Sequence, residues 1–292
     1  MIQAFVKRHK LPPAFAPLAE QYYLPLCEWV LPQIGAKPVV LGINGAQGTG
    51  KSTLAEFVAD YFKAQEKTVV SLSIDDLYLT KSERADLAQR IHPLMQTRGV
   101  PGTHDVQAGI HYIQALKRGE PCKIMRFDKS IDDRCGESEW TRVHNAPDVI
   151  ILEGWCVGAV PQVVSSLQRP INDLEIKEDA SGIWRHYVND ALAEYQRLFA
   201  ELDFLVMLKA PNFDCVYQWR LEQEQKLAAA TGGGSGIMSA EQIARFIQHY
   251  ERLTQHNLDT LPAVADVVFH LNNKHQIDKA EYKPAGIPKS LI

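Results

Sequence analysis

Residues 45–53, which read GAQGTGKST, constrain the fold of this chain more than any other segment. They match the pattern G-x-x-x-x-G-K-[ST], in which backbone N–H groups surround a chain of phosphates because glycine leaves no side chain in the way. An apolar run at residues 38–43 precedes the segment, and an amphipathic stretch follows it, as expected of a buried strand and a helix. The positive end of that helix would face the phosphates. The alternative, a glycine turn without a ligand, needs a chance match at four fixed positions, so the segment predicts a nucleoside triphosphate site.

Two side chains of this loop have predictable roles. Lys51 is expected to reach the β- and γ-phosphates, and the Ser52 hydroxyl to hold Mg²⁺. The predicted nucleotide-binding residues are Gly45, Ala46, Gln47, Gly48, Thr49, Gly50, Lys51, Ser52 and Thr53. A GTP-dependent switch would carry an N-K-x-D segment after a strand, and the nearest candidate at residues 273–276, NKHQ, lacks the aspartate. A GTPase is therefore disfavoured, although the sequence alone does not identify the base.

Composition excludes several classes of partner. The formal net charge of −4 gives no basic surface for DNA, RNA or an anionic membrane. The chain has no run of about 18 apolar residues, and its first ten residues lack the order of charges of a signal peptide. The five cysteines are scattered without a C-x-x-C pair, which favours reduced thiols. We therefore expect a cytoplasmic protein without a membrane or nucleic-acid partner. The sequence does not indicate the oligomeric state.

Short apolar runs alternate with helical stretches from residue 38 onward. Strands are predicted at residues 39–43, 68–74, 148–152, 204–208 and 266–271, and helices at 52–65, 106–117, 184–200, 213–230 and 239–256. This alternation predicts an α/β fold of the P-loop NTPase type, a three-layer sandwich with a mostly parallel sheet that binds ligands at the carboxyl ends of its strands.

The predicted division is an N-terminal helical wrap at residues 1–37 and a catalytic domain at 38–292, with a helical lid around 213–245. A helix is predicted at residues 19–30 of the wrap, which contains five prolines. Residues 157–182 are interpreted as an irregular insertion. The glycine-rich patch at 231–236 is either a flexible loop or the hinge of the lid.

Acidic residues follow two of the predicted strands, where a phosphoryl-transfer site would lie. Asp75 ends the second strand and Glu153 the third. Phosphoryl transfer needs one carboxylate to orient or deprotonate the attacking hydroxyl and another to hold Mg²⁺ or its waters. Asp75 suits the first role and Glu153 the second, while Asp76 is an N-cap or a supporting group.

Several motifs in a fixed order resemble one kinase family. They are SIDDLYLT at 73–80, RGVPGTHD at 98–105, RFDKS at 126–130, LEGW at 152–155, YQWRLE at 217–222 and GIMS at 236–239. They resemble the D-glycerate 3-kinases of plants and their yeast and bacterial relatives, within the group of P-loop kinases that includes uridine, pantothenate and phosphoribulose kinases. With the glycine loop, the resemblance runs from about residue 38 to about residue 256. The resemblance implies transfer of the γ-phosphate of ATP to a hydroxyl of a small acceptor, with Asp75 as the base, Glu153 near the metal, and ATP and Mg²⁺ as cofactors.

The resemblance also suggests an acceptor site. A hydroxy acid such as glycerate would need cations for its carboxylate. The residues that fall in the family's acceptor segments are Asp76, Tyr78, Arg98, His104, Asp105, Arg126, Asp128, Lys129 and Arg134. Each cation alone could be a solvated surface charge, and His104 a neutral structural histidine.

Arg220 is the last candidate catalytic residue. The matching helix in related kinases forms a lid, from which an arginine can neutralise charge on the transferred phosphate. The alternative is an ion pair with Glu222 or Glu224, and Trp155, Trp184 and Trp219 are expected to be core residues. D-glycerate is the leading acceptor; a sugar acid, a nucleoside or a pantothenate-like molecule are alternatives, and an ATPase switch or interaction protein is a different class.

Overall fold

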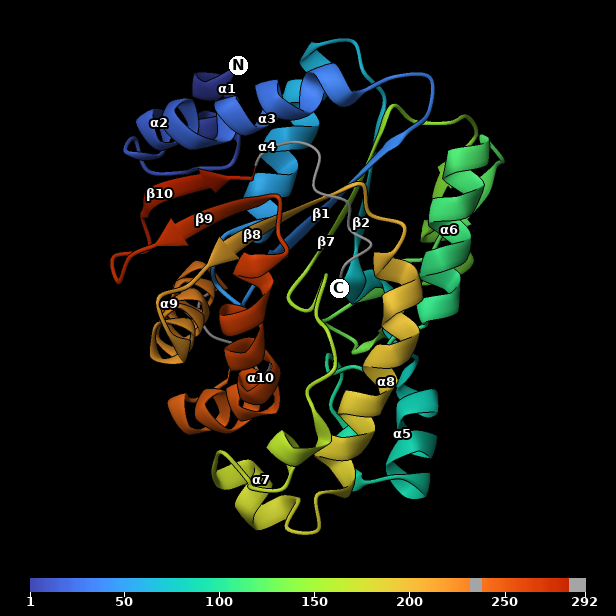
Figure 1. The fold of residues 1–292 in the computed structure, drawn as a ribbon, viewed down its shortest axis with the longest axis vertical. Helices are drawn as coiled ribbons and strands as arrows, with labels where there is room; N and C mark the ends of the chain where they lie inside the picture. Colours follow the sequence, from blue (N-terminus) through green and yellow to red (C-terminus); the bar gives the residue numbers. More distant parts are fainter. Residues whose placement is uncertain (232–237, 284–292) are drawn as a thin grey trace.

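A six-stranded sheet forms the centre of the chain, which a computed structural model describes for residues 1–231 and 238–283 (Figure 1). The strand order is β10-β9-β8-β1-β7-β2. The strands are β1 (Val39–Gly45), β2 (Val69–Ser73), β7 (Val149–Gly154), β8 (Phe204–Lys209), β9 (Val267–Leu271) and β10 (Ile277–Tyr282). The first five run parallel and β10 pairs antiparallel with β9. The predicted fold class is therefore confirmed.

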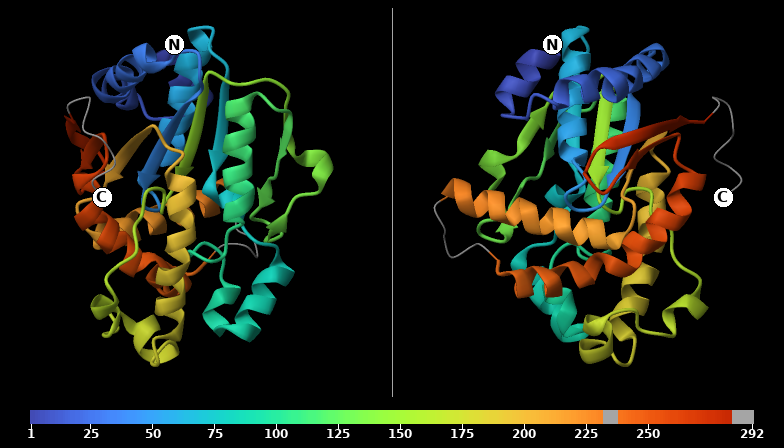
Figure 2. Two further views of the ribbon diagram at one scale, coloured as in Figure 1. Left: turned by 45° about the vertical axis from the view of Figure 1, so that its right-hand side comes forward. Right: turned by 90° about the vertical axis from the view of Figure 1, so that its left-hand side faces the viewer.

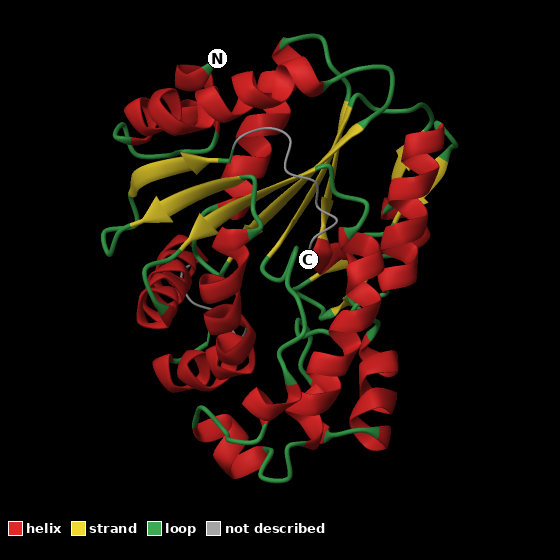
Figure 3. Cartoon of the chain, in the orientation of Figure 1, coloured by secondary structure: helices red, strands yellow, loops and turns green. Residues whose placement is uncertain are grey.

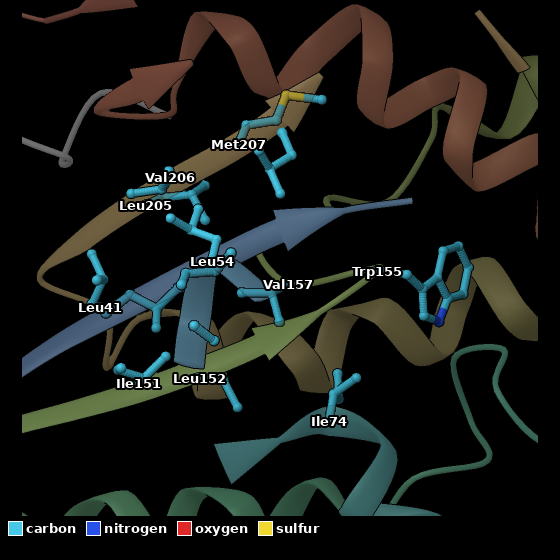
Figure 4. Packing of buried hydrophobic residues seen from close by; sticks show 14 of the residues in the cluster. Leu41, Leu54, Ile74, Ile151, Leu152, Trp155, Val157, Leu205, Val206 and Met207 are labelled. Atoms are coloured by element: carbon cyan, nitrogen blue, oxygen red, sulfur yellow. The ribbon is translucent and has the colours of Figure 1, made fainter. Parts of the chain in front are cut away.

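Strand β1 lies in the middle of the sheet, between β7 and β8, and all seven of its residues are buried. Helices cover both faces, so apolar side chains point to both sides and the strand reads as a continuous apolar run. Figure 4 shows Leu41 of β1 and Leu54 of the following helix packed with Ile151 and Leu152 of β7. The core thus fixes the strand that leads into the glycine loop.

The helices form a layer on each side of the sheet (Figures 1 and 2). Helix α4 (Lys51–Ala64) lies on one side, together with α1 (Ile2–Arg8), α2 (Phe15–Leu18), a π-helical turn (Ala19–Tyr23) and α3 (Leu24–Val30). Helices α6 (Val106–Arg118) and α8 (Ile183–Phe199) lie on the other.

Aromatic contacts attach the N-terminal helices to the core. Phe5 and Tyr23 pack edge-on against Phe57 of α4, with ring centroids 5.3 Å and 5.5 Å apart, and Tyr23 also contacts Phe269 of β9. The two residues are 1 % and 4 % exposed, so the segment contributes to the main core from outside α4. The division at residue 37 stays a prediction.

A second group of helices lies beyond the carboxyl ends of the central strands (Figure 3). It comprises α5 (Lys81–Arg90), α7 (Asp173–Glu178), α9 (Phe213–Thr231) and α10 (Ala240–Thr260). In the right-hand view of Figure 2, α9 crosses the molecule directly under the strands with α10 beneath it. Two small hairpin sheets, β3 (Cys122–Ile124) with β6 (Thr141–Val143) and β4 (Phe127–Asp128) with β5 (Asp133–Arg134), complete the fold.

The five predicted strands and five predicted helices are confirmed within a few residues, but others were missed. Strand β10 is largely exposed on one face and polar, so its apolar period is weak. Helix α5 begins at a Thr80–Glu83 capping box, yet most of its residues are polar and only Arg84 and Leu87 are buried, so its apolar pattern is weak. The interpretation of residues 157–182 as irregular was wrong in part, because they contain a 3-10 turn (Val164–Leu167) and α7. The glycine patch lies almost entirely in residues 232–237, outside the described part, and its two interpretations stay untested.

Two expectations from composition can be compared with the structure. All five cysteines lie in the described part of the chain and are free thiols. None of the helices in residues 1–231 and 238–283 combines the length and the apolar character needed to cross a bilayer. The cytoplasmic location itself stays a prediction.

Candidate active site

A cavity of about 570 Å³ lies at the carboxyl ends of β1, β2 and β7, and residues of α9 and α10 form its opposite wall. It is lined by Gln47, Gly48, Lys51, Ser52, Asp75, Tyr78, Arg98, Lys129, Glu153, Trp155, Arg220, Gln223, Glu224, Phe246 and Tyr250. Parallel strands bring their carboxyl ends to one edge of a sheet, which is why side chains distant in sequence meet here. Ten of the predicted site residues lie in this wall.

The glycine loop closes tightly between β1 and α4. The Thr49 hydroxyl and backbone N–H both donate to the carbonyl of Ala46, at 2.8 Å and 3.2 Å. Gly48 has φ +79°, and a Cβ there would lie 2.8 Å from the Cβ of Trp219 on α9. Gly48 is not a fixed position of the motif; glycine is needed because α9 crosses the loop so closely. The loop leads into the N-terminus of α4, where unpaired N–H groups favour phosphate.

Glu153 lies beside the loop, at the end of β7. Its Oε1 accepts hydrogen bonds from the Ser73 hydroxyl at 2.9 Å and the Ser52 hydroxyl at 3.3 Å. Its Oε2 is buried and has no hydrogen-bond partner among the described residues. A buried carboxylate oxygen without a partner next to a hydroxyl suits a hard cation such as Mg²⁺. The described residues hold no group of three or more His, Cys, Asp or Glu side chains suited to a metal.

Asp75 lies in a short 3-10 turn (Ile74–Leu77) that follows β2. The Ser73 hydroxyl caps this turn by accepting from the Asp75 N–H at 3.3 Å. A Cβ on Gly154 would lie 2.3 Å from Ile74, so glycine at the end of β7 lets the turn pack directly against that strand. This contact holds Asp75 and Glu153 at the same edge of the sheet (Figure 4 shows Ile74 and Trp155 there).

Two neighbours hold the Asp75 carboxylate. Tyr78 donates its hydroxyl to Oδ1 at 2.7 Å, and the Lys129 ammonium donates to Oδ2 at 2.5 Å. Burial opposes ionisation of Asp75, but the positive charges of Lys129 and Lys51 and the two hydrogen bonds outweigh it and lower its pKa to about 2. Asp75 is therefore an anion throughout the physiological pH range.

Arg98 lines the cavity and belongs to an ion-pair network that is partly buried. Asp132, in the turn between β4 and β5, pairs with Arg98 and with the fully buried Arg84. Arg84 also donates to the carbonyls of Leu79, at 2.7 Å, and of Asp132, at 3.0 Å. The network fastens the β4–β5 hairpin, which carries Lys129, to α5.

The structure does not bring the other predicted acceptor residues to the cavity wall. Asp76, in the same 3-10 turn as Asp75, pairs with Arg126 at 2.5 Å. Asp105 caps α6 by accepting from the Ala108 N–H at 3.0 Å, and Asp128 accepts from Ser130 within its own turn. Arg134 donates to the Tyr78 carbonyl at 3.1 Å. These contacts support the segments around Asp75, so we propose positioning roles in place of direct acceptor contacts.

His104 is also buried behind the cavity, at 6 % exposure. Its Nδ1 lies at hydrogen-bond distance, 2.6 Å, from the Tyr195 hydroxyl, which also accepts from the Gly102 N–H at 3.1 Å. Burial lowers the pKa of His104 to about 4. His104 is thus neutral at pH 7 and cannot supply a positive charge to an acceptor, in keeping with the structural alternative.

This burial predicts a pH dependence of stability. In the unfolded chain His104 titrates near 6.5 and in the folded chain near 4, so the unfolded state binds an extra proton between these values. The free energy of unfolding should therefore fall as the pH drops from 6.5 toward 4, by about 2 kcal/mol at pH 5 from this residue alone. Denaturant titrations measure the free energy of unfolding at pH 7 and at pH 5. The decrease between the two pH values should be smaller for His104→Gln than for the wild type. The control His111→Gln, on the exposed face of α6, should keep the wild-type difference; equal differences in all three proteins would contradict the assignment.

Arg220 lines the cavity from α9 and pairs with Glu224 at 2.6 Å. Glu224, one of the two pairing partners considered, is itself 3 % exposed and accepts from the Met238 N–H at 3.0 Å. The ion pair is compatible with a role in the cavity. The Arg220 side chain pairs with Glu224 and is 17 % exposed, and it still lines the cavity together with residues of the glycine loop.

Several wall residues were missed by the sequence analysis. Trp155, Trp184 and Trp219 are buried, as expected, yet Trp155 also faces the cavity. The Trp155 indole N–H donates to the Gly99 carbonyl at 2.8 Å, and the Tyr250 hydroxyl donates to the Arg98 carbonyl at 2.9 Å. Tyr250 and Phe246 come from α10, whose strong amphipathic pattern indicates a core face and gives no sign of a ligand.

Comparisons with known proteins agree with this geometry. The chain is 37% identical over 229 residues to an uncharacterized kinase of Schizosaccharomyces pombe, covering 75% of this chain and 80% of that protein. It is 31% identical over 265 residues to the chloroplastic D-glycerate 3-kinase of Arabidopsis thaliana, covering 83% of this chain but 55% of the plant protein. A solved structure of a D-glycerate 3-kinase from Cryptococcus neoformans superposes with a TM-score of 0.74 at 26% identity, covering 89% of this chain and 99% of that one. No family model matches the chain.

Proposed function

Because the chain belongs to the family of D-glycerate 3-kinase-like P-loop kinases, and so is an ATP-dependent phosphotransferase that acts on a hydroxyl, we propose that its acceptor is D-glycerate. The proposal concerns the acceptor and the residues that act on it. D-glycerate combines a carboxylate with hydroxyls a few bonds away, so its site needs a cation close to a base.

The observation that supports the proposal is a pair of cations in the cavity that contains Asp75. Lys129 contacts Asp75 directly, and Arg98 lines the same cavity, with its guanidinium over the ring of Phe127, 5.7 Å from the ring centroid. A guanidinium and an ammonium next to the base suit a small hydroxy acid. A nucleoside or pantothenate-like acceptor offers mainly neutral groups at that distance from its hydroxyl.

The proposed reaction assigns a role to each wall of the cavity. Asp75 accepts the proton of the attacking hydroxyl, while the new O–P bond forms and the bond from the γ-phosphorus to ADP breaks. Lys51 and Arg220 lie on the nucleotide side and offset negative charge on the transferred phosphoryl group. Ser52 and Glu153 would hold Mg²⁺, which neutralises phosphate charge when bound.

Release of ADP from Mg·ATP, measured with and without acceptor, tests the function. D-glycerate should stimulate ADP release strongly and yield phosphoglycerate, whereas uridine, pantothenate and glycerol should stimulate it weakly. Stimulation by one of these alternatives and none by D-glycerate would overturn the acceptor assignment. If no acceptor raises the rate of ADP release, an ATPase switch would be favoured instead. The cations Arg98 and Lys129 in the cavity wall support a kinase, because a switch needs no site for a second substrate.

The metal assignment predicts the behaviour of Glu153→Gln. An amide keeps the hydrogen bonds from Ser52 and Ser73 but removes the charge that attracts a divalent cation, so the Mg²⁺ concentration for half-maximal activity should rise about tenfold or more. Titration of activity with Mg²⁺ at saturating ATP measures this. The control Glu201→Gln, whose partners Lys117 and Gln114 lie away from the cavity, should keep the wild-type Mg²⁺ dependence. An unchanged requirement in Glu153→Gln would remove Glu153 from the metal site.

A further inference from the structure

Both oxygens of the proposed base are occupied before any substrate arrives. Tyr78 donates to Oδ1 of Asp75 and the Lys129 ammonium to Oδ2, at 2.7 Å and 2.5 Å. An ammonium at hydrogen-bond distance lowers the affinity of a carboxylate for a proton and blocks the approach of a hydroxyl to that oxygen. Asp75 in this arrangement is therefore a poor base.

The two contacts differ in how firmly they are held. Tyr78 is 5 % exposed, packs against Phe127 and His104, and lies three residues from Asp75. The Lys129 side chain is 59 % exposed and extends from a hairpin turn. A long, solvent-exposed ammonium can leave a single partner at low cost, since exposed ion pairs contribute little. Lys129 is thus the contact that a ligand can displace.

The hairpin itself is fixed. Asp132, three residues beyond Lys129, adopts φ +57° and is bound by Arg84, which has no exposed surface, and by Arg98. The buried guanidinium of Arg84 also donates to the carbonyls of Leu79 and Asp132, so we expect a displacement of Lys129 to involve its side chain and not the backbone. The backbone at Lys129 consequently stays in place while its ammonium can move, and Arg98 keeps its pair with Asp132 in the wall of the same cavity.

We propose that Lys129 blocks Asp75 in the empty enzyme and that the anionic group of the acceptor draws the ammonium away, so that the acceptor itself releases the base. This inference rests on the proposed function, because it assumes phosphoryl transfer to an acid. Tyr78 stays on Oδ1 and keeps the carboxylate oriented, while Oδ2 becomes free for the acceptor hydroxyl. Neutral alcohols and water lack the anion, so they leave the base blocked. Lys129 thereby determines specificity for acids and suppresses loss of ATP to water.

The test measures ATP hydrolysis in the absence of any acceptor. Lys129→Met removes the ammonium and leaves Asp75 with Tyr78, so acceptor-independent hydrolysis should rise about tenfold or more. The matched control is Lys123→Met: Lys123 belongs to neighbouring β3, is 51 % exposed and pairs with Glu137 instead of a cavity residue. It should hydrolyse ATP at the wild-type rate. The double variant Asp75→Asn/Lys129→Met should return to the wild-type rate or below.

A second comparison uses glycerol, which has the hydroxyls of glycerate without the carboxylate. The ratio of kcat/KM for D-glycerate to that for glycerol should fall about a hundredfold in Lys129→Met, through loss with glycerate and gain with glycerol. If another acid is the true acceptor, the hydrolysis measurement still tests the inference, because it contains no acceptor. Unchanged or lower hydrolysis in Lys129→Met, or loss of Mg·ATP binding by that variant, would overturn it. Loss of glycerate turnover alone would indicate a simple binding residue.

Discussion

Replacement of Asp75 by asparagine is expected to lower kcat by about a thousandfold, because a general base contributes roughly two to four powers of ten. The amide cannot accept the proton of the acceptor hydroxyl, yet it still accepts the hydrogen bond from Tyr78. The Mg·ATP affinity should change little, since Asp75 lies in the 3-10 turn after β2, outside the glycine loop. Single-turnover measurements at saturating ATP, together with nucleotide binding, separate these two effects.

The neighbouring carboxylate provides the control. Asp76 pairs with Arg126 and accepts from the Phe127 N–H at 3.3 Å, away from the cavity. Asp76→Asn keeps the shape of this contact and should cost about tenfold in kcat or less, through a small shift of the hairpin. Equal losses in the two variants would mean that the structure of the turn matters and that Asp75 has no special chemical role.

Replacement of Arg220 by alanine has the second-largest expected effect, a loss of about a hundredfold or more in kcat with little change in ATP affinity. The reason is that charge on the transferred phosphoryl group grows in the transition state, where a guanidinium from α9 acts most strongly. Steady-state kinetics with varied ATP, compared with direct ATP binding, measure the two quantities. An equal loss in both would assign Arg220 to ground-state nucleotide binding.

The variant Arg220→Ala also removes the ion-pair partner of Glu224, which is only 3 % exposed. An unpaired buried carboxylate costs stability whether or not Arg220 acts in catalysis. Arg220→Ala/Glu224→Gln removes that cost and should keep the loss of kcat. Arg245 of neighbouring α10 makes an exposed pair with Glu178 of α7, so Arg245→Ala should be close to the wild type. Recovery of activity in the double variant would show that the ion pair, and not catalysis, explains Arg220.

Local patterns predicted the scaffold of the site well. The glycine loop, the strands at its two sides and the carboxylates Asp75 and Glu153 follow from apolar runs that end in a polar residue. The cavity wall was predicted less well: Asp76, His104, Asp105, Arg126 and Asp128 share motifs with wall residues but point into other contacts. Adjacent residues in a turn point in different directions, and a sequence motif does not indicate which of them point into the cavity.

The sequence by itself determined that this chain builds a mostly parallel α/β sheet with a phosphate-binding loop, since strand period, glycine spacing and helix start are local properties. Tertiary structure decided the rest. It placed Tyr250 and Phe246 of α10 opposite the loop, and it turned residues 173–178 into a helix whose buried Glu175 is bound by Arg252 of α10 at 2.6 Å. It also set Lys129 against Asp75, 54 residues earlier. Contacts between segments so distant in sequence depend on how helices and hairpins pack over the sheet. That packing is determined by the free energy of the whole core and not by any single segment.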